Sequence, residues 1–242
     1  IAYPGLSLAL ELARVSDGRQ MQALLPIHGQ LPRFVALPGR ERFLRIDWES
    51  WIQSAQLPHR WLLVAANWYY VAGFLPVVIG IACLTAMRNH PAFLWWRSRF
   101  AVTLLIAMIG FASFPLAPPR MLPDMVDTLT TYGPHYYGND HGSSLFNAYG
   151  RMPSLVNVYA AMPSMHVAWS IIAGAMLIAA FNRARWAVVI GVLHPVLMSW
   201  AVITTANHYL LDVVIGVATL VLAIGVLQIV DRMRTRQEHE SA

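Results

Sequence analysis

The chain has 242 residues, of which 57% are hydrophobic and 12% are charged. Ordinary soluble domains carry about 25% charged residues, so this composition excludes such a domain and predicts an integral membrane protein. The net charge of +5 does not indicate nucleic-acid binding. The basic residues lie scattered at the borders of apolar runs and form no continuous stripe.

All 17 basic residues are arginine, and the chain contains a single cysteine, Cys83. The absence of lysine excludes a Schiff-base lysine and a P-loop lysine, so any basic side chain that binds phosphate has to be an arginine. One cysteine excludes an intrachain disulfide and a structural zinc site of the cysteine type.

Residues 1–60 form the first predicted segment. They carry seven of the arginines together with Trp48 and Trp51, and Trp61 follows directly. Tryptophans around an amphipathic stretch are typical of a segment that lies in the membrane interface. We therefore expect an N-terminal interfacial segment, and an additional helix upstream of or within it stays open as a sixth span.

Five later stretches are apolar over about 20 residues, the length that crosses the hydrocarbon core of a bilayer as a helix. They lie near 61–87, 100–117, 163–181, 186–206 and 209–230. The sequence thus predicts an all-α protein, a polytopic membrane helical bundle over residues 61–230. Within the five spans the only carboxylate is Asp212.

Arginines between the spans predict the orientation, because short cytoplasmic loops are enriched in basic residues. Because successive spans cross the membrane in opposite directions, three groups of arginines fall on one side, which we expect to be cytoplasmic. The groups are Arg88, Arg97 and Arg99; Arg183 and Arg185; and Arg232, Arg234 and Arg236. A tail over 231–242 is expected on the same side. The loop 118–162 is then expected on the opposite face of the cell membrane. Loops of this length inside a compact protein are usually functional.

Two short polar motifs stand where long apolar runs begin, and both are expected on the non-cytoplasmic face. In Pro163-Ser164-Met165-His166, the proline suits the first turn of a helix whose N-terminal amides and serine hydroxyl attract a phosphate oxygen. His166 is then placed to donate a proton to a leaving group. Polar groups at the ends of membrane helices cost solvation energy, which favours a functional reading.

In the second motif, His208 and Asp212 are spaced i, i+4, which on a helix puts them on one face. A carboxylate that accepts a hydrogen bond from one ring nitrogen leaves the other as a base, a metal ligand or a nucleophile. Arg120 follows prolines at the outer end of the second span, where its guanidinium suits a phosphoryl group. Together these residues predict a phosphoryl-transfer site.

The Pro-Ser-x-His element, the later His-x-x-x-Asp and the upstream Pro118-Pro119-Arg120 resemble the type 2 phosphatidic acid phosphatase superfamily. The tract from Phe114 to Arg120 and the residues next to both histidines are most similar to its inositolphosphotransferase branch, which includes inositol phosphorylceramide synthases. The resemblance covers roughly residues 61–230.

The resemblance implies roles for the motif residues. It makes His208 the nucleophile that forms a phosphohistidine, Asp212 the residue that orients it, and His166 the general acid. Arg120 and Ser164 would bind phosphate. The implied substrate is a lipid phosphate or phosphodiester, with water or a polyol as acceptor and with no metal or other cofactor required.

The chain departs from the phosphatase pattern at two basic positions. It lacks the lysine ahead of the first-motif arginine, and Val202 stands where the pattern has an arginine six residues before the nucleophile. These departures favour the inositolphosphotransferase-like branch over a standard lipid phosphatase. Arg151 in the loop is a candidate substitute for the missing phosphate contacts.

Other interpretations remain open at this point. The His208 and Asp212 pair, or Arg120, can simply anchor a helix end among lipid headgroups. A lipid or ion transporter with a polar site at one membrane face is the alternative function. A metal-dependent hydrolase with His166, His208 and Asp212 as ligands, or with a metal in the 118–162 loop, is a third.

Overall fold

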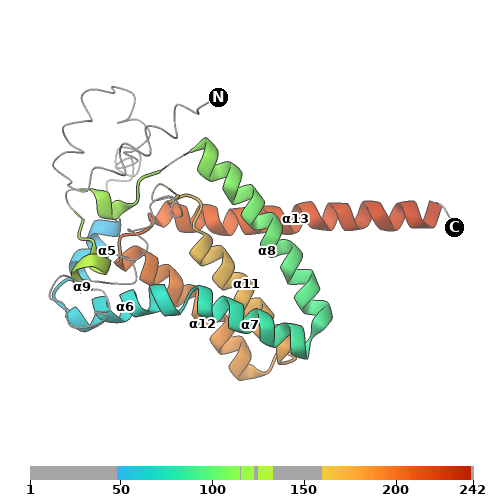
Figure 1. Ribbon diagram of the computed structural model, residues 1–242, viewed down its shortest axis with the longest axis horizontal. Helices are drawn as coiled ribbons and strands as arrows, with labels where there is room; N and C mark the ends of the chain where they lie inside the picture. The colour runs from blue at the N-terminus through green and yellow to red at the C-terminus, as the bar shows by residue number, and fades with distance from the viewer. Residues whose placement is uncertain (1–47, 115, 123–124, 133–159, 241–242) are drawn as a thin grey trace. The chain divides into compact units, whose positions relative to one another are not determined.

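The computed structural model describes residues 48–114, 116–122, 125–132 and 160–240 of the chain (Figure 1). All regular elements in this part are helices, which confirms the predicted all-α class. In chain order they are α5 (Trp48–Gln56), α6 (Arg60–Ala72), α7 (Leu75–Arg88), α8 (His90–Ser113), the 3-10 turn η2 (Pro119–Met121), α9 (Thr128–Tyr132), α11 (Met165–Ala180), α12 (Arg185–Thr204) and α13 (Leu210–Glu240).

The chain divides into two compact units, and each is described by itself. Unit 1 comprises the described parts of Ile1–Tyr70 and Phe111–Met162, together with Ala201–Leu210. Unit 2 comprises Val71–Gly110, Pro163–Trp200 and the described part of Leu211–Ala242. The chain therefore passes from one unit to the other next to each of the two polar motifs.

Each of the five predicted spans corresponds to helical structure. By length and composition α8, α12 and α13 are able to cross a membrane, and α6 with α7 forms a bent pair that makes a fourth candidate. The predicted span at 163–181 is α11, an apolar helix of 16 residues. At about 1.5 Å per residue it is shorter than the hydrocarbon core. Its side chains are mostly buried by neighbouring helices.

The predicted boundary between the first two spans was wrong. Arg97 and Arg99, expected in a loop, lie inside α8, which begins at His90. Asn89 explains the early start: its side-chain oxygen accepts from the Ala92 N–H at 3.2 Å, a typical N-cap contact. The helix therefore starts directly after α7 ends, and both arginines are carried on it.

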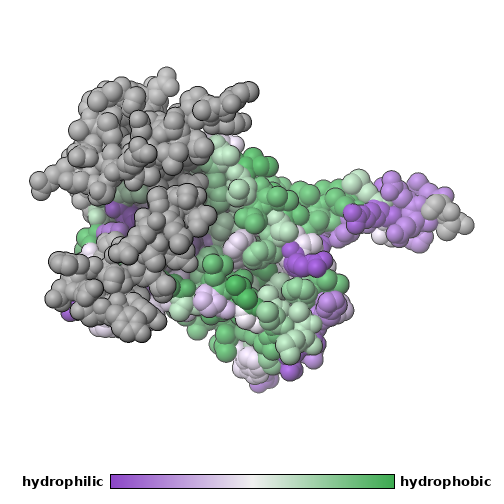
Figure 2. Space-filling view, in the orientation of Figure 1, coloured by the Kyte–Doolittle hydropathy of each residue, from purple (hydrophilic) through white to green (hydrophobic). Residues whose placement is uncertain are grey.

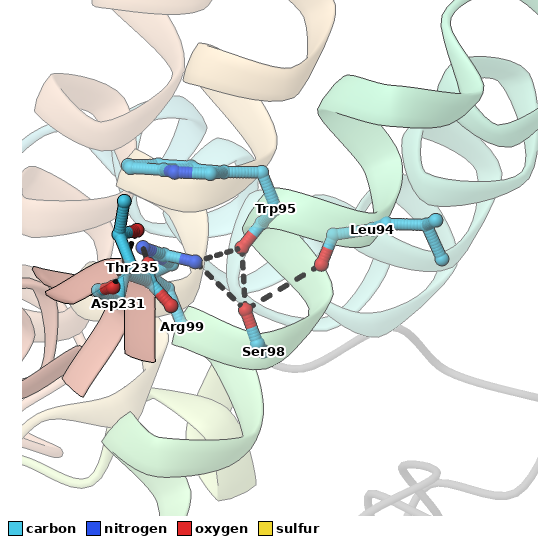
Figure 3. A network of polar contacts seen from close by, with 6 residues as sticks. All are labelled: Leu94, Trp95, Ser98, Arg99, Asp231 and Thr235. Carbon is cyan, nitrogen blue, oxygen red and sulfur yellow. Dashed lines mark hydrogen bonds and ion pairs between the residues drawn. The ribbon is translucent and has the colours of Figure 1, made fainter. Parts of the chain in front are cut away.

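Arg99 is buried and pairs with Asp231 of α13 at 3.1 Å, within unit 2. Figure 3 shows the guanidinium between this carboxylate, the Trp95 carbonyl and the Ser98 hydroxyl. The guanidinium also lies 3.9 Å from the centre of the Trp95 ring. These contacts satisfy much of the buried charge and join α8 to α13, which continues as a helix through the predicted tail to Glu240.

The core of unit 2 is built around α11. Ala168, Ile172 and Met176 pack with Leu220 of α13. On another side α11 approaches α12 backbone to backbone: a Cβ added to Gly174 would lie 2.0 Å from the Gly191 carbonyl oxygen. Small residues at such a contact let two membrane helices approach closely.

In unit 1 the short helix α5 buries its polar side. Glu49 and Gln53 are buried, while Trp48 and Trp51 are exposed. The neighbouring helix α6 is joined to α9 by Asn67, whose amide donates to the Thr128 carbonyl at 2.7 Å. The polarity of α5 is therefore opposite to that of a surface helix of a soluble protein, in which the polar side faces outward.

Large hydrophobic side chains are exposed along the long helices. On α12 they include Val189, Val192 and Val196, and on α13 Val221 and Leu222. Figure 2 shows the middle part of α13 as hydrophobic and the part toward its C-terminal end as hydrophilic. Contiguous exposed apolar surface of this kind is expected of helices that face lipid. The protein is therefore an integral membrane protein.

Candidate functional site

The turn that carries His208 connects α12 to α13 in unit 1. The end of α12 forms a Schellman motif, in which the Asn207 N–H donates to the Val202 carbonyl at 3.0 Å and the Ala206 N–H donates to Ile203 at 2.9 Å. Ala206 has a φ of 53°, in the left-handed region that favours glycine. All residues from Ala201 to Tyr209 are buried. The turn is thus a tight, enclosed segment.

The imidazole of His208 contacts a backbone carbonyl of the same unit. Its Nδ1 lies 2.7 Å from the Ala161 oxygen. A carbonyl oxygen only accepts hydrogen bonds, so a neutral His208 carries its proton on Nδ1 and its lone pair on Nε2. The ring is therefore held in the tautomer that makes Nε2 the basic nitrogen.

His208 and Asp212 do not share a helix, contrary to the prediction from their spacing. The Schellman end of α12 and the residues after it occupy the chain up to Tyr209, and α13 begins only at Leu210. Asp212 therefore lies in the first turn of α13, while His208 lies before that helix begins, and the Asp212 side chain is fully buried in unit 2. That Asp212 orients His208 stays a prediction.

Arg120 lies in η2 and is fixed to the His208 turn. Its backbone N–H donates to the Ala206 carbonyl at 2.8 Å, and its Nη1 donates to the Asn207 side-chain oxygen. The Asn207 amide in turn donates to the Thr205 hydroxyl at 2.8 Å. The predicted arginine and the predicted nucleophile are thus joined through the residue that precedes the histidine.

Apolar packing supports these residues from the side of the 118–162 loop. Leu116, Ala161 and Tyr209 form a buried cluster. Leu116 also pairs with Ala160 in an isolated parallel bridge. These contacts hold the Ala161 carbonyl in place, because they join the segment before the predicted loop, at Leu116, to the segment at its end, at Ala160 and Ala161.

Ser164 is the N-cap of α11 in unit 2, so Pro163 lies before the cap and not in the first turn as expected. The Ser164 backbone is extended and its hydroxyl makes no capping bond. The side chain is fully buried, and within the described residues its Oγ has no hydrogen-bond partner. A buried hydroxyl normally finds a partner. Here a polar group remains available beside the N-terminal amides of a helix.

The first turns of α13 pack directly against Ser164, within unit 2. The Ser164 N–H donates to the Asp212 carbonyl at 3.0 Å. One turn later, a Cβ added to Gly216 would lie 2.4 Å from the Ser164 oxygen. Gly216 therefore permits a backbone-to-backbone contact that brings Asp212 and Ser164 together.

His166 follows in the first turn of α11 and is partly buried. Its ring lies 4.1 Å from the ring of Phe74, at an interplanar angle of 34°. Phe74 stands at the break between α6 and α7 and stacks in turn on Trp169, 5.7 Å away. Both aromatic rings belong to unit 2, and they limit the orientations open to the His166 side chain.

Arg151 and the loop residues 133–159 lie outside the described residues. Val202 has a buried side chain, and its carbonyl accepts from both Asn207 and His208. Among residues 48–114, 116–122, 125–132 and 160–240, no three side chains of the metal-binding types come together.

The sequence interpretation missed four residues that contact the predicted site residues. Asn207 and Ala161 lie near His208 in unit 1, and Gly216 and Phe74 lie near Ser164 and His166 in unit 2. Asn207 directly precedes a motif residue, which is a signal that a closer reading can use. Ala161 acts through its carbonyl and Gly216 through the lack of a side chain. Neither leaves a trace in residue type alone, and Phe74 is one of many aromatic residues in the chain.

The comparisons with known proteins agree with these features. A family model described as the PAP2 superfamily matches residues 36–226. The match includes the residues of both motifs and Arg120, and it also includes α5, which the resemblance by motif did not cover. No solved structure matches the chain.

Proposed function

The chain belongs to the PAP2 superfamily of membrane phosphatases and phosphotransferases, and on that premise we propose that it transfers a phosphoryl group from a lipid through a phosphohistidine on His208. The observation that carries this proposal is the contact between His208 Nδ1 and the Ala161 carbonyl. A histidine whose Nδ1 proton is held this way presents its Nε2 lone pair for attack on phosphorus.

The reaction has two steps in this proposal. Nε2 attacks phosphorus, the bond from phosphorus to the ester oxygen breaks, and His166 gives its proton to the departing alcohol. Water or an alcohol then attacks the phosphohistidine while His166 accepts its proton, which releases phosphate or a new ester and restores His208. General acid and base catalysis of this type contributes about 10² to 10⁴ in rate.

Phosphate binding falls to Arg120, Ser164 and the N-terminus of α11. The Arg120 side chain, tied to Asn207, supplies positive charge, and the buried Ser164 hydroxyl together with the first amides of α11 supplies uncharged donors. Donors fixed in advance stabilise charge as it develops in the transition state.

For the substrate, we propose a lipid phosphate or phosphodiester, because the molecule exposes apolar helices and is itself a membrane protein. The inositolphosphotransferase-like branch is the favoured subclass, since the chain contains no lysine and Val202 replaces an arginine of the phosphatase pattern. We place the site on the non-cytoplasmic face, because arginines are enriched in short cytoplasmic loops. The arginines that support this orientation are Arg88; Arg183 and Arg185 after α11; and Arg232, Arg234 and Arg236 near the end of α13.

The test is to trap the phosphoenzyme. Purified protein in detergent is mixed with lipids labelled in the phosphate group, quenched in alkali, and analysed for protein-bound label. We expect label in the wild type and in the control variant His59→Ala, which alters an exposed histidine. We expect none in His208→Ala. In His166→Ala we expect slow labelling from natural esters. Equal turnover in all of these folded variants would reject the proposal.

The same preparation separates the alternatives. A carrier has no compartments to connect in detergent, so catalytic turnover there excludes transport as the whole function. Activity that survives prolonged chelation excludes the metal-dependent hydrolase. Discharge of the labelled enzyme by added inositol, compared with discharge by water alone, decides between a transferase and a phosphatase.

A further inference from the structure

The short helix α5 contacts both ends of the turn that carries His208. Its buried side presents Glu49, Gln53 and Gln56 toward Thr204, the last residue of α12, and Leu210, the first residue of α13. All of these residues belong to unit 1. The sequence predicted only an interfacial role for this segment.

Gln53 and Gln56 hold the start of the turn. The Gln53 amide nitrogen donates to the Thr204 carbonyl at 3.1 Å, and the Thr204 hydroxyl donates to the Gln56 side-chain oxygen at 3.0 Å. Gln53 is itself anchored on Val126, accepting from its N–H at 2.9 Å and donating to its carbonyl at 2.8 Å. Both the nitrogen and the oxygen of the Gln53 side-chain amide are therefore hydrogen-bonded.

Glu49 holds the end of the turn. Its carboxylate accepts from the Leu210 N–H at 2.5 Å. The first amides of a helix have no partner within the helix, and a carboxylate at this position satisfies one of them and complements the helix dipole. Glu49 thus fixes where α13 begins, two residues after His208.

The burial of these side chains indicates a positioning role. Glu49 is 3% exposed and Gln53 is 2% exposed. Burying such groups costs free energy unless their hydrogen bonds are well made, and apolar residues would pack a helix more simply. Polar contacts specify position and direction, which apolar contacts do not.

We propose that α5 is a clamp that positions His208 for attack, with Glu49 and Gln53 as its positioning residues. The clamp rests on the proposed function of His208 as nucleophile. It acts from the two ends of the turn, while Arg120 holds the middle through Ala206 and Asn207. Precise placement of a nucleophile matters because small displacements of a reacting atom reduce the rate by about 10²-fold.

The experiment compares four variants of the full chain in detergent: Glu49→Ala, Glu49→Gln, Gln53→Ala and the control Ser54→Ala. Ser54 lies on the exposed side of the same helix, where its hydroxyl donates to the Trp51 carbonyl. For Glu49→Ala and Gln53→Ala we expect kcat to fall about tenfold to a hundredfold while KM stays within about threefold. Glu49→Gln keeps the accepting oxygen and should restore most of kcat.

Hydrogen exchange gives a second measurement that does not require activity. In Glu49→Ala and Gln53→Ala, peptides that cover residues 204–210 should exchange faster than in the wild type, and peptides from α7 and α11 should not change. In Glu49→Gln and Ser54→Ala the exchange of residues 204–210 should match the wild type.

The outcomes separate the two proposals. Turnover that depends on His208 but is the same in Glu49→Ala, Gln53→Ala and Ser54→Ala overturns the clamp alone. So does unchanged exchange over residues 204–210 in both alanine variants. A wild-type protein that transfers no phosphoryl group from any lipid overturns the proposed function, and with it the catalytic part of the clamp. If Glu49→Ala and Gln53→Ala also raise exchange in α7 and α11, the variants have lost folding in general. This result overturns the clamp as well.

Discussion

Arg120 donates a hydrogen bond to the side chain of Asn207, the residue immediately before His208. The same arginine donates its backbone N–H to Ala206 at 2.8 Å, so side chain and main chain both connect η2 to one turn. A guanidinium held at a single, defined position keeps its remaining N–H groups ready for an anion. The position of Arg120 is therefore fixed relative to the turn that carries His208.

Asn207→Ala is the first prediction from this arrangement. We expect kcat/KM to fall about tenfold to a hundredfold, because Arg120 loses its orienting partner. Asn207→Asp should weaken the inhibition by orthophosphate further, since the new carboxylate competes with the phosphate for Arg120. Inhibition constants and kinetics in detergent measure both effects. Wild-type constants in the two variants would contradict the role of Asn207.

Ser164→Ala should separate function from stability. Within the described residues its buried hydroxyl makes no hydrogen bond, so removing it should leave the unfolding free energy unchanged or raise it. Activity should fall about tenfold if the hydroxyl binds phosphate. Ser199→Ala is the matched control, because that hydroxyl bonds within its own helix to the Pro195 carbonyl. Equal activity of both variants would exclude Ser164 from the site.

Gly216→Ala should destabilise the protein and impair activity together. The added Cβ would lie 2.4 Å from the Ser164 oxygen, so α13 has to move away at a cost of about 1–3 kcal/mol. Gly225→Ala on the same helix meets no heavy atom within 4 Å and should leave the protein as stable or more so. Thermal unfolding in detergent compares the pair. Identical midpoints would argue against the close contact.

Ala206 tests the turn before His208. Its φ of 53° costs a residue with a Cβ about 1–2 kcal/mol, so Ala206→Gly should raise the unfolding midpoint or leave it unchanged. Ala206→Val should lower it, since a β-branched residue is poorly tolerated in this conformation and the site is buried. A valine variant as stable as the wild type would contradict the left-handed geometry.

Asp231→Asn should destabilise the protein by about 1 kcal/mol, because it leaves the buried Arg99 without its counter-charge. The value is small because Asp231 is 55% exposed and solvent screens the pair. Adding Arg99→Met to this variant removes the buried charge and should recover stability. Unfolding in detergent of the two single variants and the double variant measures the coupling.

Apolar length and spacing predicted the helices of this protein well, since membrane helices are defined by composition. The five predicted spans all contain helices, and α11 begins within two residues of its predicted start. The start of α8 was missed because Asn89 serves two helices: its N–H donates to Thr85 at the end of α7, and its side chain accepts from Ala92. The sequence around it shows no break long enough to suggest this.

The site was harder to predict than the fold. Spacing placed His208 and Asp212 on one helix, but α12 closes with a Schellman motif at a non-glycine residue, Ala206, which sequence rules do not anticipate. The partner of His208 Nδ1 is the carbonyl of Ala161, a group that every residue type carries. The polar side of α5 faces inward, against the pattern that amphipathic helices usually follow.

The contact at Gly216 also bears on how this chain can vary. Because Ser164 meets α13 backbone to backbone, the relation between these two segments depends on one missing side chain and on no particular neighbouring residue. The outward residues of α13, such as Val214, Val217 and Val221, are exposed. They are free to change with the thickness and composition of different bilayers. At Gly216, in contrast, every residue with a side chain is excluded, because its Cβ would collide with the Ser164 backbone.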